Sequence, residues 1–213
     1  MRKIKFVNEE YYHIFNRGVD KRDIFLSEKD LKRFLQSMQE FNVIKPIGSI
    51  YAASFRKRSP LLRDLVSKKE EKLVNFICYC LNPNHYHFIL QQLADRGIEK
   101  LMHRLGLGYA SYFNKKNLRS GSLFEGTFKA IHIDSSEYLL HASVYVNLND
   151  EVHRIKNSLV LSSWKEYSHF MGNGFCEKSI ILDQFQNQKK YKEFAMGILP
   201  IIQERKELMK IET

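Results

Sequence analysis

The spacing of apolar residues predicts alternating strands and helices over the first 150 positions. Apolar positions alternate over 11–18 and end at Gly18, which predicts a strand followed by a turn. After Ser27 they recur every three or four residues, as in a capped helix. Two apolar runs, 73–80 and 85–92, flank an Asn-Pro-Asn turn and predict a hairpin. The remaining predicted elements are a helix over 97–116, a strand over 126–134, and a helix that Asp134 caps and that ends near Leu148.

This order of elements predicts the fold class. Strand, helix, strand, strand, helix, strand is the split βαβ, ferredoxin-like order, so we expect an α+β fold with an antiparallel sheet and helices on one face. Residues 1–150 are expected to form the main domain and 151–213 a C-terminal helical tail. Over 46–71 the periodicity is lost in a stretch with glycine and prolines, which predicts an inserted segment.

Charge adds an expected partner to this picture. The 213 residues carry a formal net charge of +10, with a pI near 9.4, which favours an anionic partner such as nucleic acid. Cations and aromatic residues are interleaved at 54–59, 114–129 and 188–194, as phosphate neutralisation and base stacking require. Lysine-rich surfaces are also common in other soluble proteins, so charge alone does not decide the function.

The sequence favours a cytoplasmic protein that is not bound to a membrane. No apolar run approaches the roughly 18 residues of a membrane span. Asn8, Glu9 and Glu10 interrupt the N-terminal region before any apolar core, unlike a secretory signal. Cys78 and Cys80 are too close along a strand for an ordinary disulfide, which fits a reducing compartment.

The candidate chemistry begins with two histidines in the predicted hairpin. His85 and His87 are two positions apart on a strand, so both imidazoles point to one face and could converge on a metal ion. A solvated sheet face is the commoner reason for such a pair. A zinc site that adds Cys78 and Cys80 is less favoured, because the cysteines continue the apolar strand face of Phe76 and zinc sites use wider cysteine spacings.

The helix after the last predicted strand offers further polar groups. Tyr138, His141, Tyr145 and Asn149 recur at spacings of three and four beside the core-facing stripe. Tyrosines on a helix usually serve packing. Their coincidence with the histidine pair makes chemistry a stronger hypothesis, in which His141 would be a candidate proton acceptor for Tyr145 and ordinary packing its favoured alternative.

Four ordered motifs resemble one known family. They are "YYHIFNRGVDKRDIFLSEKDLKRFL", "CYCLNPNHYHFILQQ", "GSLFEGTFKAIHIDSSEYLLHASVYVNLN" and "NSLVLSSWKEYSHFMGNG". Together they are similar to the HUH-type single-tyrosine transposases of the insertion-sequence-200-like group, and most of all to the REP-associated tyrosine transposases. The resemblance implies that His85 and His87 bind a divalent cation, magnesium or manganese (Mg²⁺ or Mn²⁺), that Tyr145 is the nucleophile, and that Asn149 completes the metal site.

The resemblance also implies a reaction and a partner. The reaction is cleavage and transfer of single-stranded DNA beside a hairpin, through a covalent 5′-phosphotyrosine, by a monomer or a homodimer. The alternative is a catalytically idle binder of structured single-stranded DNA or RNA. Two features depart from the family. Asn82 replaces the usual methionine before Pro-Asn-His, a replacement that we expect to be neutral, and the segment 46–71 is longer here than in the compact family core.

The remaining candidates concern DNA binding. Basic residues near strand ends or in the inserted segment are expected to bind phosphates. For the two basic residues that lie near strands, an ordinary solvated surface charge is an equally favoured alternative. The aromatic residues of the C-terminal motif, Trp164 and Tyr167, are expected to pack rather than stack on bases, and His13 to lie at the sheet face rather than on the metal. The candidate DNA-binding cations are Arg17, Arg56, Lys57, Arg58 and Lys129.

Overall fold

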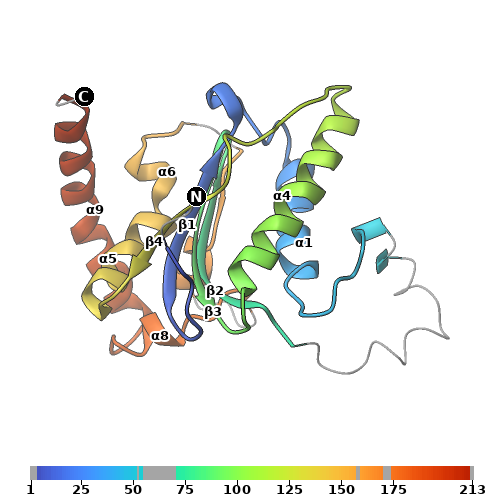
Figure 1. Cartoon of the computed structure of the whole chain (residues 1–213). Helices are drawn as coiled ribbons and strands as arrows, with labels where there is room; N and C mark the ends of the chain where they lie inside the picture. Colours follow the sequence, from blue (N-terminus) through green and yellow to red (C-terminus); the bar gives the residue numbers. More distant parts are fainter. Residues whose placement is uncertain (1–3, 52, 55–70, 157–158, 170–173, 212–213) are drawn as a thin grey trace.

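The computed structural model describes residues 4–51, 53–54, 71–156, 159–169 and 174–211. For residues 208–211 it describes only the backbone. Its centre is a five-stranded antiparallel sheet in the order β4-β1-β3-β2-β5 (Figure 1). The first four strands therefore have the 4-1-3-2 order of the ferredoxin-like split βαβ unit, which confirms the predicted α+β class. The strands are β1 (Tyr11–Arg17), β2 (Val74–Asn82), β3 (His85–Gln92), β4 (Lys129–Ile133) and β5 (Leu161–Ser162).

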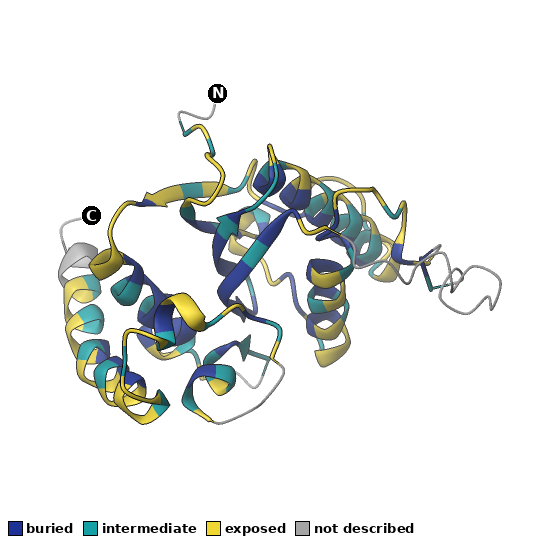
Figure 2. Cartoon of the chain, turned by 90° about the horizontal axis from the view of Figure 1, so that it is seen from below, coloured by how far each residue is buried: buried dark blue, intermediate teal, exposed yellow. Residues whose placement is uncertain are grey.

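Helices cover both faces of the sheet, whereas the sequence led us to expect them on one (Figure 1). The two crossover helices, α1 (Glu28–Glu40) and α4 (Gly97–Lys116), pack on one face, as expected for this fold. The opposite face is also apolar, since Ile89 of β3 is as deeply buried as its neighbour Phe88, and later helices cover it (Figure 2). These are α5 (Ser136–Asn147), α6 (Asn149–Val152) and α9 (Gln188–Ile211); the shorter elements are η1 (Val19–Lys21), α7 (Trp164–Ser168) and α8 (Ser179–Leu182).

A close helix–helix contact and an ion pair with a buried carboxylate join α1 to α4. A Cβ on Gly108 would lie 2.8 Å from the Phe41 ring, so this glycine allows the two helices to approach. Lys116 Nζ lies 2.7 Å from Asp30 Oδ1, and the Asp30 side chain is completely buried. Burial alone would raise the pKa of Asp30, but hydrogen bonds from Lys116 and Tyr112 and other donors outweigh it, and the pKa is lowered.

A β-bulge in β2 changes which residues face the two layers. Phe76 pairs with Leu90 and Cys78 with Ile89, so the register shifts by one residue between them. Phe76 therefore faces the α1 side, where its ring contacts Phe88 at 5.5 Å between centroids. Cys78 lies on the α5 side with Ile89. The predicted single apolar face shared by Phe76 and both cysteines is therefore wrong.

The C-terminal residues pack on the same sheet. β5 pairs with β2, and the buried Tyr167 donates a hydrogen bond to the Ile77 carbonyl at 2.7 Å, so this tyrosine packs as expected. The Tyr191 hydroxyl of α9 lies 3.0 Å from the Ser143 hydroxyl of α5.

The predicted division at residue 150 between a main domain and a C-terminal tail stays a prediction. Residues 55–70 of the predicted insertion, with Arg56, Lys57 and Arg58, lie outside the described residues. No helix within the described ranges combines the length and apolarity that crossing a membrane requires.

Candidate functional site

β3 places the histidine pair on the sheet face that α5 covers. His87 is paired with Phe15 of β1 on one side and with Cys80 of β2 on the other, so it lies in the middle of the sheet. Its ring stacks on Phe15 at 5.5 Å between centroids and its side chain is almost fully buried. His85 lies at the start of the strand, 5.3 Å from His87 between ring centroids and perpendicular to it.

Tyr145 of α5 lies against these histidines within the same chain. Its ring is perpendicular to His87, with the centroids 5.5 Å apart, and it lies 5.8 Å from the ring of His13. Burial raises the pKa of the Tyr145 phenol, and the neighbouring Asn149 side chain acts in the opposite direction. The structure thus brings together the predicted nucleophile and the predicted metal-binding pair.

Asn149 reaches the site because the helix breaks before it. The sequence predicted that one helix caps at Asp134 and runs to about Leu148. In the structure the Ser135 side chain accepts the capping hydrogen bond, from the Tyr138 amide, and α5 ends at Asn147. Leu148, at φ −112° and ψ 29°, then turns the chain, and Asn149 begins α6. Its Oδ1 lies 3.1 Å from His85 Nε2.

The hydrogen bonds around His85 fix which ring nitrogen carries the proton. Asn84 Nδ2 donates to the Lys21 carbonyl at 3.1 Å, so Asn84 Oδ1 faces His85 Nδ1 at 2.6 Å. An amide oxygen only accepts, so His85 Nδ1 donates to it. The lone pair of His85 Nε2 is therefore directed toward Asn149 and Asn82.

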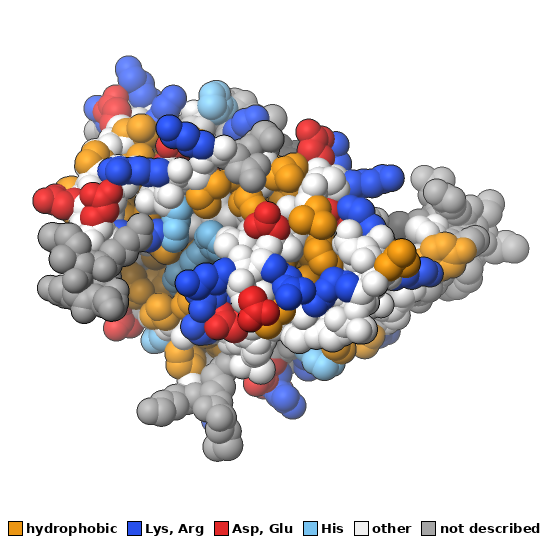
Figure 3. All heavy atoms as spheres, turned by 90° about the horizontal axis from the view of Figure 1, so that it is seen from above, with side chains coloured by type: hydrophobic (Ala, Val, Ile, Leu, Met, Phe, Trp, Pro, Cys, Tyr) orange, Lys and Arg blue, Asp and Glu red, His pale blue; other side chains and the backbone are white. Residues whose placement is uncertain are grey.

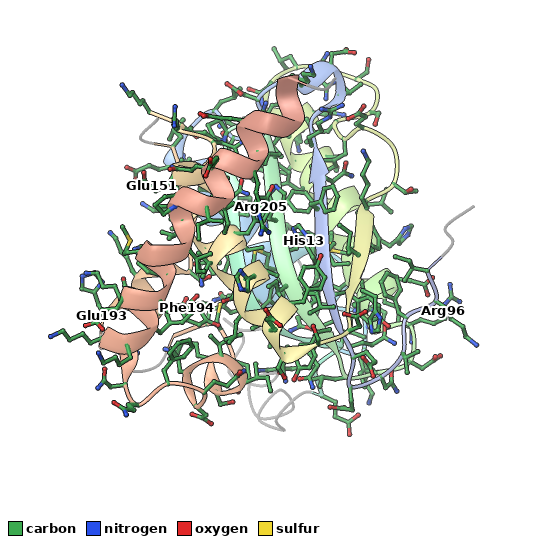
Figure 4. The ribbon with its side chains drawn as sticks, turned by 90° about the vertical axis from the view of Figure 1, so that its left-hand side faces the viewer. His13, Arg96, Glu151, Glu193, Phe194 and Arg205 are labelled. Carbon is green, nitrogen blue, oxygen red and sulfur yellow. The ribbon has the colours of Figure 1, made fainter. Side chains whose placement is uncertain are left out.

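A third histidine supports His87 from the neighbouring strand. His13 Nε2 of β1 lies 2.8 Å from His87 Nδ1, and both side chains are buried. Figure 4 shows His13 on β1, at the sheet face over which α5 and α9 lie. The prediction put His13 at the sheet face and did not foresee this hydrogen bond.

Burial keeps the three imidazoles neutral. It lowers the pKa of His13 to about 4 and lowers that of His87 well below its usual range, where the neighbouring histidines add to the effect. Burial also lowers the pKa of His85, while Asn149 Oδ1, which would accept a hydrogen bond from the protonated ring, opposes this shift. Neutral imidazole is the form that binds metal ions, so the protonation states suit a metal site.

The donor set fits a hard divalent cation. His85, His87 and Asn149 would supply two imidazoles and one amide oxygen, and Asn149 Nδ2 is buried without a hydrogen bond to any described residue. A buried N–H donor of this kind normally has an acceptor such as water or a substrate oxygen. Mn²⁺ and Mg²⁺ accept mixed oxygen and imidazole ligands with open positions.

Zinc is a poorer fit to the same residues. Within the described ranges, no group of three or more His, Cys, Asp or Glu side chains could hold a metal ion. Burial raises the pKa of both the Cys78 and the Cys80 thiols, which keeps them protonated.

The site opens into a basic pocket of about 500 Å³. In the space-filling view, histidine side chains lie at the bottom of a hollow with Lys and Arg side chains beside it (Figure 3). Arg17 forms an ion pair with Glu125. The sequence analysis predicted Arg17 but not Glu125. The His153 ring, also missed, lies 5.2 Å from that of His85. The pocket is lined by Phe15, Asn16, Arg17, Lys21, Asn84, His85, His87, Glu125, Lys129, Tyr145, His153 and Ile155.

Two other predicted residues are placed by the structure. Lys129 begins β4, is exposed and lines the pocket. The ring of His141 contacts Phe194 of α9 at 5.9 Å between centroids, which supports its packing role rather than a role as base for Tyr145.

Comparison with known solved structures gives a distant structural likeness. No family model matches the chain, and no curated protein matches it. A solved structure described as "Structure of the REP associates tyrosine transposase bound to a REP hairpin" is similar to it with a TM-score of 0.44 and 11% sequence identity. The match covers 72% of this chain and 73% of that chain. A likeness at this level leaves the function to be argued from the residues of the chain itself.

Proposed function

We propose that this chain is a metal-dependent single-stranded DNA endonuclease and strand transferase that acts near DNA hairpins through a covalent bond to Tyr145. The observation that carries the proposal is the perpendicular contact between the Tyr145 and His87 rings, 5.5 Å between centroids. A phenol beside neutral imidazoles, in a pocket with Arg17, Lys21 and Lys129, combines a nucleophile, metal ligands and phosphate-binding cations.

His85, His87 and Asn149 would hold Mg²⁺ or Mn²⁺. When bound, the ion would polarise the scissile phosphate and neutralise part of its charge. That help is needed because a phenol has an ordinary pKa of about 10 and burial raises the pKa of Tyr145 further.

The chain's own residues would position and carry out the transfer. Arg17, Lys21 and Lys129 would bind the DNA phosphates and align one of them with Tyr145. The Tyr145 oxygen forms a bond to phosphorus and its proton leaves to solvent in the open pocket. The bond to the 3′ oxygen breaks, and that oxygen takes up a proton. Attack by a free 3′ hydroxyl on the phosphotyrosine reverses these steps and joins the strands.

Tyr145 contacts a histidine of its own chain, which supports a monomer as the active form. Sedimentation of the protein with a hairpin DNA tests this part, and a monomer that forms the covalent adduct is the expected result. An adduct formed only by mixtures of two inactive variants, one lacking Tyr145 and one lacking His87, would instead indicate a dimer with shared sites.

The direct test is a covalent adduct. The protein is incubated with Mn²⁺ and single-stranded hairpin oligonucleotides from the genome that encodes it, and a protein–DNA species that survives denaturation is sought. Tyr145→Phe should abolish this species. Tyr138→Phe is the control, because Tyr138 lies on the same helix but outside the pocket and is 37% exposed; it should retain the adduct. An adduct that survives Tyr145→Phe refutes the choice of nucleophile. Tight hairpin binding without any adduct would support the alternative of an idle binder.

A further inference from the structure

The departure at Asn82 lies directly in the candidate metal site. Asn82 is the last residue of β2, is paired with His85, and its side chain has no exposed surface. Its Nδ2 lies 2.9 Å from His85 Nε2 and 2.7 Å from Asn149 Oδ1. The amide thus donates to the same two lone pairs that a cation would use.

The three atoms have the spacing of neighbouring ligands on one ion. His85 Nε2 and Asn149 Oδ1 are 3.1 Å apart, so the three separations lie between 2.7 and 3.1 Å. An octahedral cation with ligands at about 2.1 Å separates adjacent ligand atoms by about 3.0 Å. The triangle formed by these atoms therefore matches one face of such an octahedron.

The Asn82 amide can exchange its nitrogen for its oxygen with little loss. A half-turn about its terminal side-chain torsion leaves the two polar atoms at nearly the same positions, interchanged. Its Oδ1 now accepts only a weak contact from the Cys80 thiol, at 3.5 Å. The turn would bring an oxygen to the corner of the triangle where the nitrogen lies.

We propose that Asn82 is an additional ligand of the cation site, with two alternative amide orientations. Without the ion, its N–H groups satisfy His85 and Asn149 and hold them in place. With the ion, the turned amide presents Oδ1 as a second amide oxygen beside that of Asn149. This inference rests on the cation site of the proposed function and adds a residue to it. The extra oxygen favours Mg²⁺ and Mn²⁺ over softer metals.

A rival role for Asn82 predicts the opposite sign. If the amide only competes with the ion for the lone pairs of His85 and Asn149, its removal should strengthen metal binding. If Asn82 is a ligand, its removal should weaken binding. Partners that merely hydrogen-bond to metal ligands change affinity by about 10- to 100-fold, so loss of a ligand should cost at least about tenfold.

The test measures Mn²⁺ affinity without DNA, from the electron paramagnetic resonance signal of the free ion. Asn82→Leu should bind Mn²⁺ at least about tenfold more weakly than the unmodified chain. Asn75→Leu is the control. Asn75 lies near the opposite end of the same strand, and its side chain donates a hydrogen bond to Gln91. It should leave the affinity unchanged. An Asn82→Leu chain that binds as tightly as the unmodified one, or more tightly, overturns the proposal.

A second measurement needs no variant. It distinguishes a metal ligand from a residue that only hydrogen-bonds to the ligands, and it also decides the question if Asn82→Leu does not fold. A crystal structure of the unmodified chain grown with Mn²⁺ should place Asn82 Oδ1 at about 2.1–2.3 Å from the anomalous peak of the ion. An Asn82 amide turned away from that peak overturns the inference and leaves the proposed function standing. Absence of any Mn²⁺ binding by the unmodified chain would overturn both.

Discussion

Replacing His13 tests whether the hydrogen bond between the first and third strands orients the metal-binding pair. In His13→Leu a side chain of similar size replaces an imidazole whose Nε2 lies 2.8 Å from His87 Nδ1. Both residues are only 7% exposed, so water cannot easily take the place of the lost partner. The His87 nitrogen would then be buried without a hydrogen bond, at a cost of about 1–3 kcal/mol in folding stability.

The same change should weaken the metal site. A metal-binding histidine whose second nitrogen loses its partner typically loses about 10- to 100-fold in metal affinity, or about 1.4–2.8 kcal/mol. We therefore expect His13→Leu to bind Mn²⁺ at least about tenfold more weakly, measured from the free-ion resonance signal.

The matched variant is His13→Gln, whose side-chain amide again offers an acceptor and a donor near the position of Nε2. It should recover most of the Mn²⁺ affinity and most of the stability. Unchanged Mn²⁺ affinity in His13→Leu would refute the orienting role, as would an equal loss in both variants. Equilibrium unfolding in urea separates the two effects, because it reports stability in the absence of metal.

Three further outcomes concern stability. Lys116→Met should lower the free energy of unfolding by about 2 kcal/mol at pH 7, since Lys116 is one-third exposed and Asp30 keeps its other hydrogen bonds. Because the folded-state pKa of Asp30 is lowered, this loss should shrink in urea titrations as the pH falls below about 4. Burial lowers the pKa of His13 to about 4, so between about pH 6.5 and 4 the unfolded chain binds a proton that the folded chain does not. His13 alone should therefore lower the unfolding free energy by up to about 3 kcal/mol on acidification, and the total fall should be smaller in His13→Gln; an equal fall in both would contradict this account. Gly108→Ala should cost about 1–2 kcal/mol by overpacking, whereas Gly106→Ala, with nothing within 4 Å of the added Cβ, should stabilise by about 0.5–1 kcal/mol in thermal unfolding.

Periodicity was enough to predict the sheet and the side of β3 on which the histidines lie. A strand alternates strictly, so His85 and His87 must share a face, and the order of elements identified the ferredoxin-like sheet. The approach of Tyr145 depended on which face α5 covers, and the pattern within one helix does not contain that information. The contact of His13 with His87 depended on the pairing of β1 with β3, a long-range register that no local pattern specifies.

The position of Asn82 was unpredictable for a more specific reason. By strict alternation, Asn82 would share a face with Phe76, which packs on the α1 side of the sheet. The extra residue in the bulge between Phe76 and Cys78 reverses the faces of every later residue of β2. Cys80 and Asn82 are thereby turned to the side of the histidines. A single inserted residue thus brings Asn82 to His85 and Asn149, and a substitution that seemed neutral in the sequence becomes part of the site.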